Sequence, residues 1–167
     1  MNNSTYDMRL LERDELNVVK ALAHDIWPRV YDYMISQEQI TYMLSLMYDL
    51  DQLKQQWLEG VKFVLLEVEG IPQGFAAFEE KENFVFLHKL YLRPEMQGKG
   101  FGKKMLQVVI DFAVESKKPS LELTVNRNNK SLEFYLGNGF VIKEEKDFDI
   151  GGGYFMNDYI LSLAVIA

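Results

Sequence analysis

The stretch Gln97-Gly98-Lys99-Gly100-Phe101-Gly102-Lys103 places three glycines within five residues. It lies between two segments of different character. The segment before it is apolar and aromatic, is typical of a strand, and ends in Leu92-Arg93-Pro94. The segment after it repeats apolar residues at i, i+3 and i+4, which is typical of an amphipathic helix. The glycines therefore occupy a turn from a strand into a helix.

Such a turn predicts an anion site. Glycine allows the backbone to approach a ligand closely, and the first N–H groups of a helix have no partner inside the helix. These N–H groups carry the positive end of the helix dipole, which suits a phosphate or a pyrophosphate. The alternative is a tight turn in which the glycines serve only its geometry.

Two common phosphate-binding motifs do not fit this turn. A P-loop requires Gly-Lys-Ser or Gly-Lys-Thr, which the stretch lacks. A dinucleotide fingerprint G-x-G-x-x-G starting at Gly98 would place Lys103 at its last glycine. The remaining pattern is Q-x-x-G-x-G, formed by Gln97, Gly100 and Gly102.

The flanking segments predict the rest of the fold. Upstream, residues 61–68, 74–78 and 84–92 are strand-like with short turns between them, which favours an antiparallel meander. Downstream, we expect a helix from about Gly100, a strand at 121–125 and a short helix at 131–136. A hairpin of residues 140–148 and 154–163 closes the chain around three consecutive glycines.

The first third of the sequence is helical in pattern. Asp14 is expected to cap a first helix, which Pro28 then disturbs. This helix carries one apolar stripe, formed by Leu16, Val19, Ala23, Ile26 and Trp27. Ser36 and Gln39 predict a capping box for a second helix, and Asp51 opens a third that ends at Gly60. The whole chain, 1–167, is thus expected to form one α/β (α+β) domain, with a mixed, mostly antiparallel central sheet flanked by helices.

Composition excludes several classes of function. The chain has 167 residues, of which 48% are hydrophobic, enough for one core. Its net charge of −7 argues against broad nucleic-acid binding and is compatible with a cationic small substrate. The absence of cysteine excludes a disulfide framework and a cysteine nucleophile. With two histidines far apart in the sequence, no metal site is expected.

Cellular location follows from the apolar runs. The longest of them are far shorter than the roughly 20 residues that span a bilayer. The first nine residues lack the apolar segment of a secretory signal. We therefore expect no membrane partner and a cytoplasmic protein. The apolar residues 164–167 and the edge strands favour a homodimer.

A second block strengthens the interpretation of the glycine turn. Residues 128–140 follow the pattern N-x-x-[AS]-x-x-F-Y-x-x-x-G-F, about thirty residues after the first block. Together with Q-x-x-G-x-G and the preceding Leu90-Tyr91-Leu92-Arg93-Pro94, it resembles the acyl-CoA-dependent N-acetyltransferase superfamily called GNAT. The resemblance covers about residues 60–163 and implies that this part is the core that binds coenzyme A.

A finer resemblance concerns the acceptor. Trp27, Tyr31, the segment 35–44 and the tail Met156-x-Asp158-Tyr159 are similar to bacterial spermidine/spermine N-acetyltransferases. This implies that the N-terminal helices, about 14–59, shape the acceptor site and that the acceptor is a small polyamine. Trp27, Tyr31 and Asp158 are then candidates for binding it.

The GNAT resemblance also implies the contacts to acetyl-CoA. The backbone at Leu90, Tyr91 and Leu92 would hydrogen-bond the pantetheine arm and the thioester carbonyl, as an extended ligand adds to a strand edge. Asn128 would also contact the cofactor. The residues that would hold the pyrophosphate are Gln97, Gly98, Lys99, Gly100, Phe101, Gly102 and Lys103.

Tyr135 is the candidate catalytic residue. It matches the position of the acid in the family, and its phenol, with a pKa near 10, suits protonation of a leaving thiolate. A buried aromatic of the short helix is the alternative. The base stays open: Leu123 stands where some related enzymes carry a glutamate, while His88, Glu79 and Asp158 remain as candidates. Glu79, His88 and Asp158 are also candidates for attracting a cationic acceptor.

The expected activity is acetyl transfer from acetyl-CoA to a primary amine by direct attack in a ternary complex. Without cysteine, a route through an acyl-cysteine is excluded. Alternatives are acetylation of a protein N-terminus, a lysine or an amino sugar, and a regulatory domain that binds coenzyme A without turnover. An unrelated α/β binding module would require both blocks to be coincidental.

Overall fold

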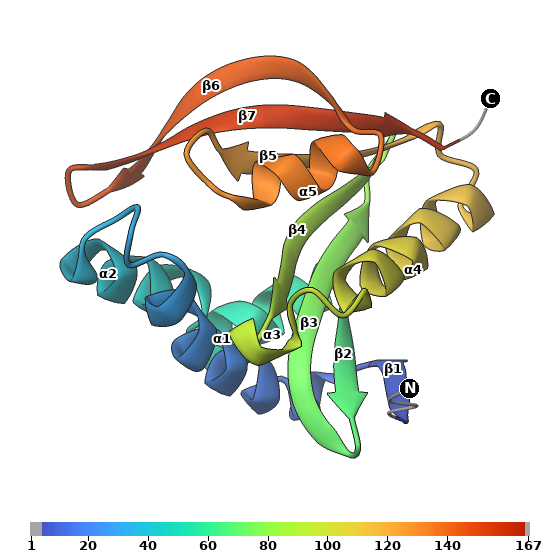
Figure 1. Ribbon diagram of the computed structural model, residues 1–167, viewed down its shortest axis with the longest axis horizontal. Helices are drawn as coiled ribbons and strands as arrows, with labels where there is room; N and C mark the ends of the chain where they lie inside the picture. The colour runs from blue at the N-terminus through green and yellow to red at the C-terminus, as the bar shows by residue number, and fades with distance from the viewer. Residues whose placement is uncertain (1–4, 166–167) are drawn as a thin grey trace. The chain divides into compact units, whose positions relative to one another are not determined.

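The computed structural model describes residues 5–165. Along this part of the chain, groups of strands alternate with groups of helices (Figure 1). Within these residues, seven strands are present: β1 (Tyr6–Leu10), β2 (Lys62–Val68), β3 (Ile71–Glu80), β4 (Val85–Leu92), β5 (Ser120–Asn126), β6 (Val141–Gly151) and β7 (Tyr154–Ala164). The α-helices are α1 (Asn17–Val30), α2 (Gln37–Met47), α3 (Leu50–Leu58), α4 (Phe101–Glu115) and α5 (Ser131–Gly137). Two short 3-10 helices are η1 (Arg13–Glu15) and η2 (Pro94–Met96). Of the apolar stretch 164–167, Ile166 and Ala167 lie outside the described residues.

The strands form one sheet in the order β1-β2-β3-β4-β5-β7-β6. Four neighbouring pairs are antiparallel, namely β1–β2, β2–β3, β5–β7 and β6–β7, whereas β4 and β5 are parallel. The prediction of a mixed, mostly antiparallel sheet flanked by helices is confirmed. Within the described residues, no helix is long and apolar enough to cross a membrane.

The N-terminal segment differs from the expectation in three ways. Asp14 does not cap α1, because it lies in η1 and the helix begins after Leu16. Pro28 lies within the last turn of α1, which continues to Val30. The strand β1 was not predicted. It pairs with β2 over its whole length, from Tyr6 opposite Val68 to Leu10 opposite Val64.

Other local signals are confirmed. The Ser36 hydroxyl accepts a hydrogen bond from the Gln39 N–H at 3.1 Å and begins α2. Only this half of the predicted capping box is confirmed, and the Gln39 side chain donates to Sδ of Met43 at 3.9 Å. Gly60, just after α3, has a φ of 107°, the left-handed conformation expected where a helix ends. The predicted apolar stripe is buried throughout: Leu16 at the N-cap of α1, and Val19, Ala23, Ile26 and Trp27 within the helix.

The chain divides into two compact units. The first contains residues up to Glu79 together with Lys89–Leu106, and the second contains Glu80–His88 together with the residues from Gln107 onward. β4 and α4 each contribute residues to both units.

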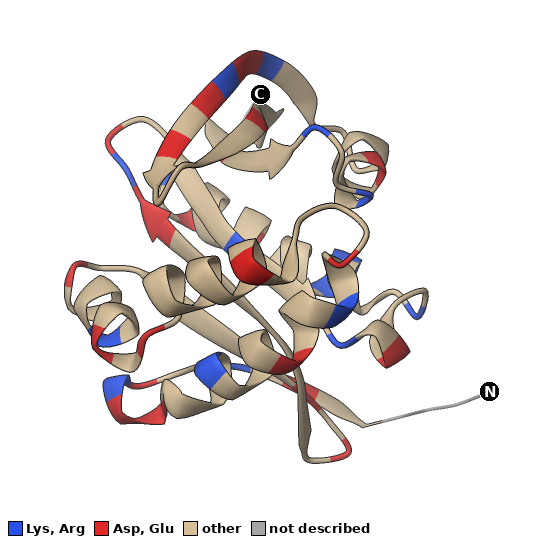
Figure 2. Ribbon diagram, turned by 90° about the vertical axis from the view of Figure 1, so that its left-hand side faces the viewer, with Lys and Arg blue, Asp and Glu red and all other residues tan. Residues whose placement is uncertain are grey.

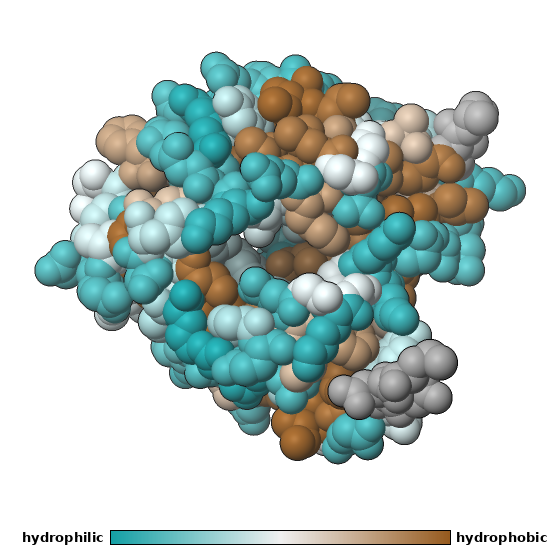
Figure 3. Space-filling view, in the orientation of Figure 1, coloured by the Kyte–Doolittle hydropathy of each residue, from teal (hydrophilic) through white to brown (hydrophobic). Residues whose placement is uncertain are grey.

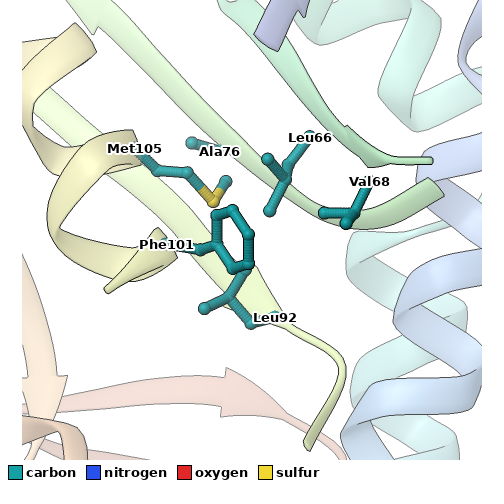
Figure 4. Close-up of a cluster of buried hydrophobic side chains, with 6 residues drawn as sticks. All are labelled: Leu66, Val68, Ala76, Leu92, Phe101 and Met105. Carbon is teal, nitrogen blue, oxygen red and sulfur yellow. The ribbon is translucent and has the colours of Figure 1, made fainter. Parts of the chain in front are cut away.

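A buried cluster in the first unit fixes the start of α4. Phe101 and Met105, from the first turns of this helix, point at side chains of β2, β3 and β4 (Figure 4). The strand residues of the cluster are Leu66, Val68, Ala76 and Leu92. Because Phe101 follows Gly100 directly, this packing anchors the end of the glycine turn.

A close approach in the first unit positions the end of β4. A Cβ atom on Gly74 would lie 2.6 Å from the carbonyl oxygen of Tyr91 and 2.7 Å from Cδ2 of Leu92. The neighbouring Gln73 is left without a partner in the β2–β3 register, and its carbonyl accepts from the Arg93 N–H at 2.8 Å. Glycine at position 74 is therefore required where β3 supports the end of β4.

The second unit is built on β5, β7 and β6, and α5 lies beside β5 (Figure 1). Acidic and basic residues are interspersed along β6 (Figure 2). Hydrophobic residues also gather over the region of β6 and β7 (Figure 3), and exposed apolar side chains in these strands include Val141, Ile142 and Phe155. Charges on an edge strand oppose pairing with other strands.

Candidate functional site

The glycine turn has the backbone conformation that its sequence predicts. Gly98 and Gly100 have φ values of 78° and 84°, in the left-handed region that favours glycine. A Cβ atom at either position would meet no atom within 4 Å. Glycine is thus required here by the backbone angle rather than by crowding, and space is open beside the turn.

The helix after the turn presents its first N–H groups and two lysines. The Gly100 carbonyl accepts the Lys104 N–H at 3.2 Å, so the helical ladder begins at Gly100. Lys99 and Lys103 are exposed. The Phe101 side chain is buried, so this residue can contribute to a ligand only through its backbone. The Gln97 side chain is exposed at the beginning of the turn.

Five aromatic rings surround the end of β4 in the first unit: Trp27, Tyr31, Tyr48, Phe75 and Tyr91. The Trp27 ring lies 4.8 Å from that of Tyr31 and 5.7 Å from that of Tyr91. The hydroxyl groups of Tyr31 and Tyr91 hydrogen-bond to each other at 2.8 Å. The cluster joins α1, which is predicted to shape the acceptor site, to β4, whose end is predicted to contact acetyl-CoA.

Lys89 was not predicted as a functional residue. It precedes Leu90 and is only 5% exposed, and its Nζ donates to Oε1 of Gln56 at 3.3 Å. The same Nζ lies 5.4 Å from the centre of the Tyr48 ring. Burial lowers the pKa of Lys89 to about 8, because an ammonium group loses its hydration there.

Ion pairs connect α1 to the segment between β4 and the glycine turn. Arg93, directly after β4, pairs with Asp25 of α1. Asp25 also pairs with Arg29 at 3.1 Å, and Arg29 pairs with Glu95 of η2. Arg93 additionally donates through Nε to the Pro72 carbonyl at 3.3 Å. The network links the first helix to the strand end and to the start of the turn.

In the second unit, Tyr135 lies on α5 and is 7% exposed. Its ring contacts Phe134 and Phe140, with centroids 5.2 and 5.5 Å away. The Phe140 N–H donates to the Tyr135 carbonyl at 3.1 Å, which ties the end of the helix to β6. The ring is therefore held firmly, as both a catalytic and a core role require.

The loop between β5 and α5 carries Asn128. Its N–H donates to Oδ1 of Asn126 at 2.9 Å, and the next asparagine, Asn129, accepts the Ser131 N–H at 2.8 Å. Arg127 donates its backbone N–H to the Asn157 carbonyl of β7 at 3.0 Å. Short polar contacts thus give this exposed loop a defined shape.

Asp158, on β7, is the most buried of the candidate site residues. It is 1% exposed, and burial raises its pKa to about 6, although nearby Arg127 and a hydrogen bond from Thr124 act in the opposite direction. Its Oδ1 atom is buried and has no hydrogen-bond partner within the described part of the chain. A buried polar atom without a partner requires an explanation.

The remaining candidates for the base differ in environment. His88 is exposed, with its ring 4.7 Å from that of Phe86. Glu79 is half-buried near the end of β3. Leu123, which stands where some related enzymes carry a glutamate, is buried. The adjacent Glu122, which is not one of the candidates, is 8% exposed and accepts from Nζ of Lys143 at 3.2 Å.

The predicted site residues divide between the two units. The first unit holds the acceptor candidates Trp27, Tyr31 and Glu79, together with Leu90–Leu92 and the glycine turn. The second unit holds His88, Asn128, Tyr135 and Asp158.

Comparison with known proteins identifies the family. The sequence model described as "Acetyltransferase (GNAT) domain" matches residues 32–152, well over half of the chain. The chain belongs to the GNAT acetyltransferase family. The predicted N-acetyltransferase class is thereby confirmed, as is acetyl-CoA as the cofactor of this GNAT protein.

Two relatives with named activities and one crystal structure are similar to this chain. A spermine/spermidine N(1)-acetyltransferase of Bacillus subtilis is 30% identical over 141 residues, which cover 78% of this chain and 91% of the relative. An L-amino acid N-acyltransferase of Escherichia coli is 31% identical over 91 residues, 51% of this chain and 53% of the relative. The crystal structure of the PaiA N-acetyltransferase of Thermoplasma acidophilum in complex with coenzyme A has the same fold. Its TM-score is 0.82 at 23% identity, with 96% of this chain and 99% of that chain covered.

The residues of this GNAT protein fit the cofactor. The turn offers left-handed glycines, open space and exposed lysines, which suit a pyrophosphate. When bound, acetyl-CoA supplies a thioester carbonyl that an amine can attack.

Proposed function

We propose that this protein transfers the acetyl group of acetyl-CoA to a primary amine of a small polyamine. The observation that carries the proposal is the 30% identity to the spermine/spermidine N(1)-acetyltransferase, which extends over 91% of that relative. The net charge of −7 also favours a polycationic acceptor, because an acidic surface attracts it.

Residues of the first unit have two roles in the proposal. The turn Gln97–Lys103 holds the pyrophosphate, and the backbone at Leu90–Leu92 orients the thioester. Trp27 and Tyr31, which are 3% and 8% exposed, form the aromatic wall on the acceptor side in this proposal. Aromatic rings attract alkylammonium groups. The Tyr31–Tyr91 hydrogen bond supports this arrangement, because it fixes an acceptor residue to the strand that orients the thioester.

In the second unit, Tyr135 acts as the general acid, and Asn128 contacts the cofactor. The Tyr135 hydroxyl protonates the departing sulfur, which the similar proton affinities of a phenol and a thiol make feasible. The amine attacks directly in a ternary complex, since the sequence has no cysteine to carry the acetyl group.

Thiol release with a panel of acceptors tests the proposed substrate. Spermidine, spermine, an α-amino acid, an N-terminal peptide and an amino sugar are each supplied with acetyl-CoA. The proposal expects kcat/KM for a polyamine to exceed that for the other acceptors by at least about tenfold, which corresponds to about 1.4 kcal/mol. Intersecting initial-rate lines are expected for a ternary complex. A preference for the α-amino acid would instead agree with the Escherichia coli relative and overturn the polyamine assignment.

Tyr135→Phe tests the acid. The substitution keeps the ring and removes only the hydroxyl, so we expect kcat to fall by about 10²-fold or more while acetyl-CoA affinity stays unchanged. Phe134→Leu, which alters the neighbouring ring, is the control for a packing effect. An unchanged kcat in Tyr135→Phe would remove Tyr135 from the mechanism.

A further inference from the structure

Asp158 combines three features that no structural need explains. It is 1% exposed in a strand of the sheet, it is ionisable, and its Oδ1 atom has no partner among residues 5–165. Removing a carboxylate from water without full compensation is costly. A residue that is kept at such a cost is a candidate for a chemical role.

The position of Asp158 ties it to the proposed acid. Asp158 is the Cα partner of Asn126, the last residue of β5. The Arg127 N–H donates to the carbonyl of Asn157, the residue just before Asp158. The loop that starts there leads into α5, which carries Tyr135. Asp158 therefore lies where the segment carrying Tyr135 leaves the sheet.

Among the described residues of the second unit, no charged side chain is hydrogen-bonded to Oδ1 of Asp158. The Arg127 guanidinium pairs through Nη2 with Oδ1 of the exposed Asp147 at 2.5 Å, and its buried Nε has no partner among the described residues. Lys146 is the Cα partner of Asp158 on β6, but its Nζ lies over the Phe148 ring at 5.3 Å.

Two glutamates on the same face of the sheet lie farther from Asp158. Glu122 of β5 is bound by Lys143, and Glu144 lies opposite Ile160, two residues along β7. The Thr124 hydroxyl donates a hydrogen bond to the Asp158 carboxyl group. Within the described residues, no cation donates a hydrogen bond to this Oδ1 atom, although the charge of nearby Arg127 lowers the pKa of the carboxyl group.

We propose that the Asp158 carboxylate is the proton acceptor that converts the ammonium group of the acceptor into the free amine. This inference rests on the proposed function. The sequence alone left the identity of the base open, because Leu123 stands where some related enzymes carry a glutamate. In this proposal Asp158 is the base. A pKa of about 6 agrees with this role, because such a carboxylate is ionised at neutral pH and is still basic enough to take a proton.

The protons balance across the reaction. The ammonium group gives one proton to Asp158, and the freed lone pair forms the C–N bond to the acetyl carbon. The C–S bond breaks with its electron pair on sulfur, which takes the Tyr135 proton. After the C–N bond forms, the nitrogen carries one proton more than the amide product, and it gives this proton to the Tyr135 oxygen. Asp158 releases its own proton to water. The net products are the amide, the free thiol and one proton.

Asp158→Asn, with Asp147→Asn as the matched control, tests the proposal. Both substitutions remove one negative charge near Arg127, but only Asp158 is buried. With spermidine, we expect the wild type to show a kcat/KM plateau above pH 6 to 7. Asp158→Asn should lose about 10²-fold at pH 7 and then gain nearly tenfold per pH unit up to pH 9, because it depends on free amine already present in solution. Asp147→Asn should keep the wild-type profile.

A second acceptor separates proton transfer from structure. An amine with a pKa near 8 is partly neutral at pH 8, so Asp158→Asn should lose less than about tenfold with it. Acetyl-CoA affinity, measured by calorimetry, should be unchanged in both variants. An equal loss with both amines, or an unchanged pH profile, would show that Asp158 only supports the fold. If the wild type itself acetylates no amine, the proposed function fails and this inference fails with it.

Discussion

Gly74→Ala gives a sharp test of how β3 positions the cofactor strand. The added Cβ would lie 2.6 Å from the Tyr91 carbonyl oxygen, 2.7 Å from Cδ2 of Leu92 and 3.3 Å from its Cα. The leucine methyl group can rotate away, but the two backbone atoms belong to the end of β4. Relief of the carbonyl contact requires a displacement of about 0.4 to 0.8 Å.

This displacement should lower both the stability of the fold and the rate of the reaction. Overpacking of a close contact costs about 1 to 3 kcal/mol, which lowers Tm by about 3 to 10 °C for a chain of this size. Misplacement of a reacting group by 1 Å can cost 10²-fold in rate, so a shift of about half that distance should lower kcat by about tenfold. The KM for acetyl-CoA should rise, because the shifted backbone is the proposed thioester contact.

Thermal unfolding and steady-state thiol release measure both effects. Gly137→Ala is the matched control, because its Cβ would meet no atom within 4 Å and its backbone angle is ordinary. That control should lower neither Tm nor kcat, since alanine is at least as stable as glycine at an unstrained helical position. A destabilised Gly74→Ala variant with wild-type kinetics would refute the role of the Leu90–Leu92 backbone. A variant without any change in Tm would refute the crowding argument itself.

Three further substitutions test separate parts of the site. Gly100→Asp should weaken acetyl-CoA binding by at least about 10²-fold in calorimetry, since a side chain at φ 84° is strained and its carboxylate repels a phosphate. Lys89→Met should raise Tm at pH 7, because the lowered pKa of about 8 means that the folded state disfavours the charged ammonium, at a cost of up to about 3 kcal/mol. This gain should shrink as the pH rises from 8 to 10.5, whereas exposed Lys20→Met should give none at any pH. Tyr31→Phe, which removes the hydrogen bond to Tyr91, should raise the acceptor KM about fivefold without changing acetyl-CoA affinity, as measured by kinetics with each substrate varied.

Local signals predicted most of the fold. The glycine turn, the Ser36 cap and the apolar stripe of α1 each depend on neighbours within a few residues, and the structure has them as expected. The strand Tyr6–Leu10 depends instead on pairing with β2, more than fifty residues away, and most of it is exposed. Its residues, Tyr6-Asp7-Met8-Arg9-Leu10, do alternate between apolar and polar, so the sequence carries a strand signal here, but this signal is only five residues long and its apolar side chains are largely exposed.

The site was less accessible to sequence reasoning. Lys89 reads as an exposed strand residue, and only packing against Tyr48 and Gln56 shows that it is buried. The sequence predicts that a strand starts at Gly74, whereas β3 begins at Ile71 and the glycine allows a close contact with β4. Both roles arise from tertiary contacts, which a single sequence does not encode locally.

The most direct test of the account is the product formed from acetyl-CoA and spermidine. Because the sequence contains no cysteine, a thiol reagent reports released coenzyme A without a background from the protein. The account predicts thiol release that depends on spermidine, together with a mass increase of one acetyl group on the polyamine. Acetyl-CoA binding without any acetylated amine, across polyamine, amino acid, peptide and amino-sugar acceptors, would contradict it.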